Sequence, residues 1–298
     1  IGPIAITTAD KAGLSLPLMV AAVIGGAMFG DNVSLISDTT IAASRTQNVN
    51  MRDEMLANFK VVIIPAILCA LFYMLPIFSG NTALHSELNL SLENFIKVCP
   101  YILLLVLGAL NVNVMLLLFL GTILNIIIGI SFGMFNIFDA LEYLGTGIES
   151  MSSTIIVAML AGGLLQVVRY NGGVDYIIKK TSNFIKSKRT CELGICALAG
   201  SINLFTANNT VAIITSGPIA KELAVKYNVS AVRTASLLDT TSCLVQGLIP
   251  YGAQILIATS LAASIGVSSF SILKGMYYPI FVFFGVLFSI LKTKEKKC

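Results

Sequence analysis

Residues 29–40 read FGDNVSLISDTT, a polar stretch that directly follows an apolar segment beginning at Leu14. Two carboxylates, Asp31 and Asp38, stand seven positions apart in it. The neighbouring hydroxyl and amide side chains are those of Asn32, Ser34, Ser37, Thr39 and Thr40. Ionisable groups inside an apolar segment are costly and indicate a functional site. Because Gly30 lets the backbone unwind without a Cβ penalty, the stretch predicts a broken helix that carries an ion site.

The composition of the 298 residues indicates a membrane protein. Charged side chains make up 11% and hydrophobic ones 56%, whereas soluble domains carry about 25% charged residues. This excludes a cytosolic globular enzyme and a disordered chain. The net charge of +4 is modest and its basic residues gather in a few loops, which is typical of membrane orientation and not of nucleic-acid binding. We therefore expect the lipid bilayer, and no nucleic acid, as a partner.

Apolar runs of about 20 residues predict membrane-spanning helices. After the first, at 14–29, they are 59–78, 95–110, 114–132, 151–168, 232–248 with a continuation to 263, and 272–291. Two amphipathic stretches, 137–149 and 174–188, are predicted to lie at the membrane interface. Since Lys and Arg favour the cytoplasmic side, the basic C-terminal tail is expected inside and His85 outside. The chain is thus predicted to be a multi-pass protein of the cell inner membrane.

The segments 191–205 and 211–218 lie between two basic loops that should both face the cytoplasm. A re-entrant hairpin with its tip at 206–210 satisfies both loops. Such backbone is tolerated in a membrane only where it is buried in protein or lines a wet cavity. We therefore place the tip residues Asn208, Asn209 and Thr210 at the site. Simple turn chemistry is the alternative for the two asparagines.

The tetrapeptide Gly-Pro-Ile-Ala occurs at residues 2–5 and again at 217–220. Each copy is followed by a helix of small residues and a polar interruption, and the loop charges orient the two copies in opposite directions. Inverted repeats with discontinuous helices that meet near the bilayer midplane are the architecture of secondary transporters. The sequence therefore predicts an all-α polytopic membrane protein, an inverted-repeat secondary transporter with a re-entrant hairpin and broken helices.

The first copy of this tetrapeptide has no hairpin before it, so we expect residues 1–298 to be a single transporter domain that is N-terminally incomplete. In this scheme residues 1–60 end the first repeat with its broken helix. Residues 61–189 supply connecting and scaffold helices together with the interfacial ones. Residues 190–298 form the hairpin, the broken helix and the last helix of the second repeat.

Asp239 is a third carboxylate within an apolar segment, and Thr240 and Ser242 continue its polar stripe. Carboxylate, hydroxyl and amide oxygens suit a hard cation such as Na⁺. Asp31, Asp38 and Asp239 are therefore the predicted Na⁺ ligands, with Asp239 as a candidate for the proton or a second cation. A helix cap is the alternative explanation for Asp38. No cofactor is implied.

The stretch at 30–40 resembles the Gly-Asp-x-x-Ser-Pro-x-Ser-Asp-Thr-Thr signature of NhaC-type sodium/proton antiporters. Residues 236–254, which include the break at Leu248-Ile249-Pro250, resemble the second signature of this family. Leu35 stands where the family usually has Pro, and Leu238 stands where it usually has an acid. The resemblance implies the wider ion-transporter superfamily, in which hairpins with Ser-Asn-Thr-like tips and unwound helices build the sites. The tip at 208–210 resembles one of these.

These observations predict a sodium/proton antiporter and no enzyme, for which a homodimer is a possible assembly. A carboxylate removed from water can hold a proton or a cation, so that H⁺ and Na⁺ compete for one site. A first alternative is a sodium- or proton-coupled exchanger of a small organic anion, or a drug efflux carrier. A remote one is an intramembrane aspartyl protease in which Asp31 and Asp239 share a proton. Its Gly-x-Gly-Asp motif fails because Met28 occupies the first glycine position.

Overall fold

The computed structural model describes residues 14–35, 37–78, 114–173, 185–262 and 266–293, together with positions 9, 96, 99–100, 102–103, 107, 176 and 179–180. Within this part of the chain all regular elements are helices, as the sequence predicts. The chain divides into two compact units. One comprises residues 1–83 and 153–298, and the other comprises residues 84–152.

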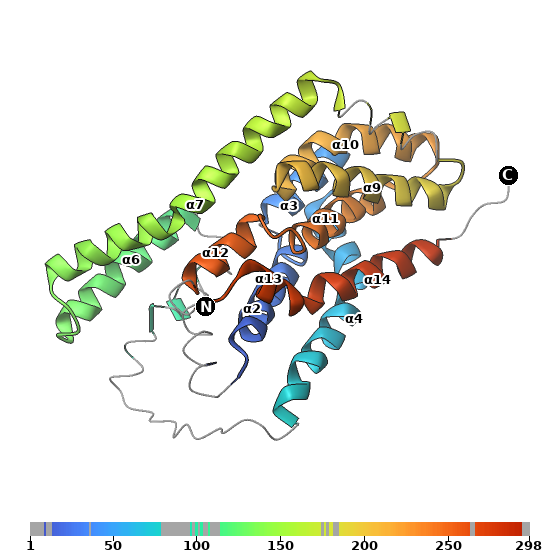
Figure 1. Ribbon diagram of the computed structural model, residues 1–298. Coiled ribbons are helices and arrows are strands. Elements are labelled where there is room, and N and C mark those ends of the chain that lie inside the picture. Colours follow the sequence, from blue (N-terminus) through green and yellow to red (C-terminus); the bar gives the residue numbers. More distant parts are fainter. Residues whose placement is uncertain are drawn as a thin grey trace. The chain divides into compact units, whose positions relative to one another are not determined.

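The first broken helix consists of α2 (Leu16–Asn32) and α3 (Asp38–Gln47), both in blue in Figure 1. The break at 33–37 confirms the predicted interruption. An acidic residue begins α3, where the positive end of the helix favours it. The helix ends at Asn48, whose left-handed conformation (φ 56°) is the usual C-terminal stop for an asparagine.

The second broken helix consists of α11 (Ala231–Gln246) and α12 (Ala253–Leu261), which are separated by residues 247–252. Gly247 begins this break, and a Cβ there would lie 2.5 Å from Cε of Met28 near the end of α2. The second break therefore lies against the end of the Met28 side chain of α2. α11 also packs against α3.

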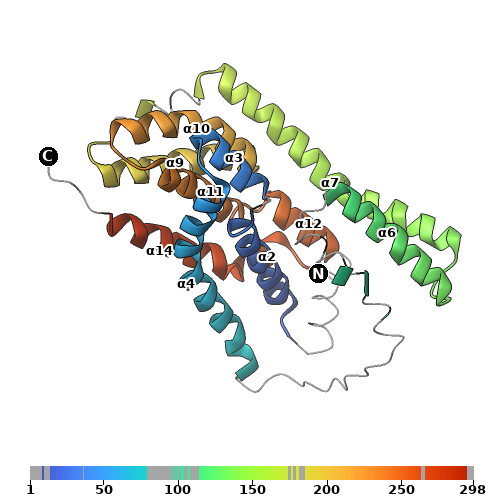
Figure 2. The same cartoon turned by 180° about the vertical axis from the view of Figure 1, so that it is seen from behind.

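A helical hairpin is formed by α9 (Lys188–Thr206) and α10 (Asn209–Lys226), which are joined by Ala207 and Asn208. The two helices pack against each other and lie side by side in both views (Figures 1 and 2). The second Gly-Pro-Ile-Ala copy lies inside α10, and the first copy lies outside the described residues. The hairpin is thus present, while its course relative to the bilayer stays a prediction.

In the larger unit α4 (Met51–Phe78) packs against α14 (Tyr277–Leu291). A Cβ on Gly285 would lie 2.8 Å from Cγ of Pro65 and 3.0 Å from the carbonyl oxygen of Val61. The glycine is therefore required for this close approach. α4 is the scaffold on which the last helix packs.

The span predicted at 272–291 is wrong in its first part, because the structure has two helices there, α13 (Ser269–Lys274) and α14. Pro279 has no amide hydrogen to donate to the carbonyl of Gly275, four residues earlier. The Tyr73 hydroxyl donates to that carbonyl instead, at 2.6 Å. The Tyr277 amide donates to the same carbonyl at 2.9 Å, so a helix can start at Tyr277 without leaving that carbonyl unsatisfied.

The smaller unit contains α6 (Val114–Ser131), and α7 (Ile137–Tyr170) begins in it. The separate interfacial helix predicted at 137–149 is wrong, because these residues form one continuous 34-residue helix with the span that follows. No proline interrupts this stretch, and isolated glycines weaken a helix without ending it. The acidic residues that suggested an interface are part of this long helix.

By length and composition, Met51–Leu75 is the one stretch among the described helices that could cross a bilayer by itself. The apolar helices Leu16–Asn32, Phe119–Ser131 and Tyr277–Leu291 are shorter. The span predicted at 95–110 and the amphipathic stretch at 174–188 lie largely outside the described residues, and so does His85.

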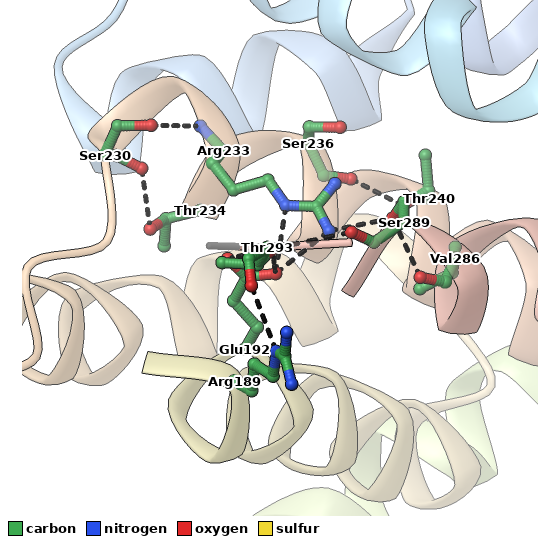
Figure 3. A network of polar contacts seen from close by, with 10 residues as sticks. All are labelled: Arg189, Glu192, Ser230, Arg233, Thr234, Ser236, Thr240, Val286, Ser289 and Thr293. Carbon is green, nitrogen blue, oxygen red and sulfur yellow. Dashed lines mark hydrogen bonds and ion pairs between the residues drawn. The ribbon is translucent and has the colours of Figure 1, made fainter. Parts of the chain in front are cut away.

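One end of α9, α11 and α14 is held together by a polar network (Figure 3). Glu192, which is 1% exposed, forms an ion pair with Arg233 at 3.0 Å. Arg233 also donates to the hydroxyl of Ser289 at 2.8 Å, and the Thr293 hydroxyl donates to Glu192 at 3.1 Å. Arg189 Nε donates to the carbonyl of Thr293 at 3.0 Å. The network links the start of α9 and of α11 to the end of α14.

Candidate functional site

The Asp239 carboxylate is the centre of the site. It lies in the middle of α11 and is fully buried, as are nearly all residues of that helix from Thr234 onward. Its Oδ2 accepts a hydrogen bond from Asn58 Nδ2 at 2.8 Å and another from the Thr40 hydroxyl at 3.2 Å. Helices α3, α4 and α11 therefore meet at one carboxylate.

The Asp31 carboxylate belongs to the last turn of α2 and is partly buried. The Ser37 hydroxyl donates to its Oδ1, and the Cys243 thiol approaches its Oδ2 at 3.1 Å. Asp31 also lies within electrostatic reach of Asp239. The first and the second broken helix thus each contribute one carboxylate to the same region.

Ser37 occupies the N-cap position of α3, yet its side chain makes no capping hydrogen bond to that helix. Its hydroxyl contacts Asp31 and, at 2.8 Å, the hydroxyl of Thr39. Asp38 is the first residue of α3 rather than its cap. In this structure the side chains around the break are therefore directed to one another, and capping does not account for them.

Asp38 faces the tip of the hairpin. The Thr210 hydroxyl donates to its Oδ2 at 2.5 Å, and Asp38 is exposed. Asn208 caps α10, since its Oδ1 accepts from the amide of Val211 at 3.0 Å, which is the turn chemistry given above as its alternative. Asn209 Nδ2 lies 3.8 Å from the sulfur of Cys243. The hairpin tip therefore contacts both broken helices.

The other polar side chains predicted on α2 and α11 lie nearby, and those of Thr240, Ser242 and Asn32 bond to groups other than a carboxylate. The hydroxyls of Thr240 and Ser242 donate to carbonyl oxygens of their own helix, those of Ser236 and Asp239, at 2.6 and 3.0 Å. Ser34 is half-buried in the break at 33–37. Asn32 Nδ2 donates to the Tyr278 hydroxyl at 3.1 Å. The polar stripe on α11 thus satisfies its own backbone rather than Asp239.

Two residues of α4 that the sequence reading does not single out belong to the site. Asn58 Nδ2 bridges Asp239 and the backbone carbonyl of Asn32, the latter at 3.1 Å. Glu54, one turn earlier, is fully buried and lies within electrostatic reach of Asp239. Their spacing of four places them on one face of α4, but nothing in the local sequence indicates that this face is buried.

Within the described residues, Asp31, Asp239 and Glu54 form no ion pair with a lysine or arginine. No three His, Cys, Asp or Glu side chains of this part of the chain are grouped so as to hold a metal ion by themselves. Any cation here would therefore also need hydroxyl, amide or backbone oxygens. Those are the ligands of a hard cation.

These features define a class of protein: a helical membrane protein in which two broken helices and a helical hairpin bring acidic side chains together in the interior. Residues 78–291 match the model of the Na⁺/H⁺ antiporter family, and the chain belongs to this family. It is accordingly membrane-integral and of a transporter family. The match includes the hairpin and Asp239.

Known relatives agree with the resemblance to NhaC-type antiporters. The Na⁺/H⁺ antiporter NhaC of Bacillus subtilis is 25% identical over 100% of this chain and 71% of its own length. An uncharacterized Na⁺/H⁺ antiporter of Haemophilus influenzae is 24% identical over 93% of this chain and 65% of its own length. The malate-2H⁺/Na⁺-lactate antiporter of Bacillus subtilis is 25% identical over 91% and 64%. The chain thus spans about two thirds of the length of these relatives. No solved structure matches it significantly.

Proposed function

We propose that the protein is a secondary active transporter that exchanges Na⁺ for H⁺ across the cell inner membrane. One observation carries the proposal. Asp31 and Asp239, one from each broken helix, lie within electrostatic reach of each other, and in the described structure no lysine or arginine pairs with either. Neighbouring carboxylates removed from water need a bound cation or proton to balance their charge.

Na⁺ would be held by these two carboxylates and by the hydroxyls that already lie against them. The Ser37 hydroxyl contacts Asp31, and the Thr40 hydroxyl contacts Asp239. Residues 33–35 add backbone carbonyls that lie outside both helices. A proton binds the same carboxylate oxygens, so Na⁺ and H⁺ compete for them.

Competition becomes exchange when the carrier changes conformation only with an ion bound. An empty site would carry uncompensated negative charge through an apolar interior, and that state is costly. A site that holds Na⁺ or H⁺ is closer to neutral and can move. Opening alternately to the two sides of the membrane then drives Na⁺ one way and H⁺ the other.

The proposal includes the course of the chain relative to the membrane. The hairpin of α9 and α10 is re-entrant, with its tip at the site. The broken helices are corresponding parts of two inverted repeats, and the basic C-terminal end faces the cytoplasm. Asp38 contacts Thr210 at the hairpin tip. In this proposal it becomes a third Na⁺ ligand when the hairpin tip moves toward Asp31 and Asp239.

Exchange of a small organic anion is the rival function, and one relative is named as a malate-2H⁺/Na⁺-lactate antiporter. The beginnings of α3 and α10 face each other across the Asp38–Thr210 contact, and helix beginnings attract anions. Three carboxyls at the centre repel an anion, however. We therefore favour the inorganic cation as substrate.

The test is Na⁺-induced movement of protons in everted membrane vesicles that contain the protein expressed from its complete gene. Wild type should move protons on addition of Na⁺, and Asp31→Asn and Asp239→Asn should reduce this to background. An amide keeps the size of the carboxylate but cannot balance a cation or release a proton. Malate and lactate gradients are offered in a parallel experiment.

Asp53→Asn is the matched control, because Asp53 is exposed on α4, one residue before Glu54. It should exchange like wild type. Full exchange by both Asp31→Asn and Asp239→Asn would contradict the proposal. Proton movement that requires malate or lactate would instead establish the organic-anion exchanger.

A further inference from the structure

The neighbourhood of Asp239 contains more hydrogen-bond acceptors than donors. Both carboxylate oxygens of Glu54, Oδ1 of Asn58 and Oδ1 of Asn32 are buried and accept no hydrogen bond. All three residues are 0% exposed. A buried polar atom without a partner is costly, so four such oxygens on three neighbouring residues need an explanation.

These oxygens belong to residues that lie against one another. The amide nitrogen of Asn58 donates to Asp239 at 2.8 Å and to the backbone carbonyl of Asn32 at 3.1 Å, so its donors are already used. Glu54 precedes Asn58 by four positions on α4, which places both side chains on one face of the helix. Glu54 also interacts electrostatically with Asp239.

No positive side chain supplies the missing partner. Apart from Asp239, the charged residues on the described helices that pack against α4 are Asp31 on α2, Asp38 and Arg45 on α3, and Arg233 on α11. Arg233 is engaged by Glu192 and Ser289 at the far end of α11. Arg45 is exposed and forms no ion pair in the described structure. α14 contributes Tyr278, whose hydroxyl bonds Asn32.

A carboxylate and two amide carbonyl oxygens, all buried and all without donors, are the ligand set of a hard cation. We propose that Glu54, Asn58 and Asn32 form a second binding site for a monovalent cation of the Na⁺ type, next to Asp239. Its other ligands differ from those of the first Na⁺ position, which are Asp31 and the hydroxyls of Ser37 and Thr40. The identity of the ion rests on the proposed function, whereas the ligand set does not.

The two sites share Asp239, because its Oδ2 touches both Thr40 on the first side and Asn58 on the second. A cation at the second site would satisfy the four free oxygens and balance the charge of Glu54. Occupation would also draw α4 toward α2 and α11, since the ligands come from α2 and α4 and the shared carboxylate from α11.

The number of bound cations tests the site directly. Binding of radioactive Na⁺ to the purified protein, expressed from its complete gene, is measured at equilibrium. Wild type should bind two Na⁺ per molecule at saturation, and Glu54→Gln should bind one. Glu222→Gln, which removes an exposed glutamate of α10, is the control and should bind two.

Glu54→Asp keeps the charge but withdraws the ligand by one methylene, so it should weaken one of the two affinities by about tenfold. If thermal unfolding shows that Glu54→Gln is not folded, Glu54→Asp is the variant that tests the second site. Unchanged binding by Glu54→Asp and Glu54→Gln would overturn the second site. So would a wild type that binds a single Na⁺ and a Glu54→Gln variant that binds it equally.

Failure of the site and failure of the proposed function are distinguishable. Two Na⁺ bound without any exchange in vesicles would contradict the antiporter and leave the second site standing. Exchange with one bound Na⁺ that Glu54→Gln does not affect would contradict only the second site. Absence of Na⁺ binding altogether would overturn both.

Discussion

The two broken helices differ in where their chemistry lies. In the first, Asp31 and Ser37 stand at the edges of the break at 33–37, and the Ser37 hydroxyl bonds the Asp31 carboxylate. In the second, Asp239 lies in the continuous part of α11, well before the break at 247–252. The carboxylate of the second helix is therefore held by neighbouring helices and not by unwound backbone.

The second break contacts the hairpin instead. Gln246 Nε2 donates to the carbonyl of Ala207 at 2.7 Å, and the Tyr251 hydroxyl donates to the carbonyl of Leu204 at 2.6 Å. These are carbonyls that the end of α9 leaves free. Two interruptions of similar appearance thus differ in their contacts: the first surrounds the proposed ion site, and the second bonds the hairpin tip.

Gln246→Leu should have the largest effect on stability. It leaves the Ala207 carbonyl without its donor, which costs about 1–3 kcal/mol. Thermal unfolding of the purified protein measures it, with Gln166→Leu on the exposed face of α7 as control. A stability equal to that of the control would mean that the second break does not anchor the hairpin.

Ser37→Ala should lower the apparent affinity for Na⁺ and change the stability of the protein much less. It removes the hydroxyl that bonds Asp31, and we expect the apparent Na⁺ affinity to fall about tenfold. Ser242→Ala is the matched control on the second broken helix, because its hydroxyl bonds only a carbonyl of its own helix. Equal losses of affinity in both variants, measured by Na⁺ titration of proton movement, would remove the distinction between the breaks.

Thr210→Ala should have the smallest effect. The Thr210–Asp38 hydrogen bond is exposed, and contacts of exposed charged groups contribute little. We expect the apparent Na⁺ affinity to fall about two- to fivefold. If Thr210→Ala lowers the Na⁺ affinity as much as Ser37→Ala does, Asp38 contributes to Na⁺ binding as strongly as Asp31.

Both breaks could be predicted from sequence because each carries local signals. Glycine and polar residues interrupt the first apolar run, and Gly247 and Pro250 interrupt the second. Asp31 and Asp239 stand out as charges within apolar segments. These features depend only on near neighbours in the chain, and the structure places both carboxylates in one region.

Glu54 and Asn58 could not be found in this way. They precede the apolar run counted from Phe59 and stand beside Arg52 and Asp53, so the stretch has the composition of a cytoplasmic loop. Only the packing of α4 against α11 buries them. The charges at 137–149 led to the opposite error, the prediction of a separate interfacial helix. Charged side chains do not end a helix, and this stretch has no proline to remove a backbone hydrogen bond.

The polar network around Glu192 and Arg233 has a mechanical consequence. Removing Arg233 would leave Glu192, which is 1% exposed, as an unpaired buried charge, so the ends of α9, α11 and α14 are held together there. The opposite ends of the same three helices lead into residues 207–208, 247–252 and 275–276, which are outside helices. Helices that are held together at one end are freer to move at the other end. In any rearrangement of these helices we therefore expect the largest displacement on the side where the hairpin tip meets the carboxylates.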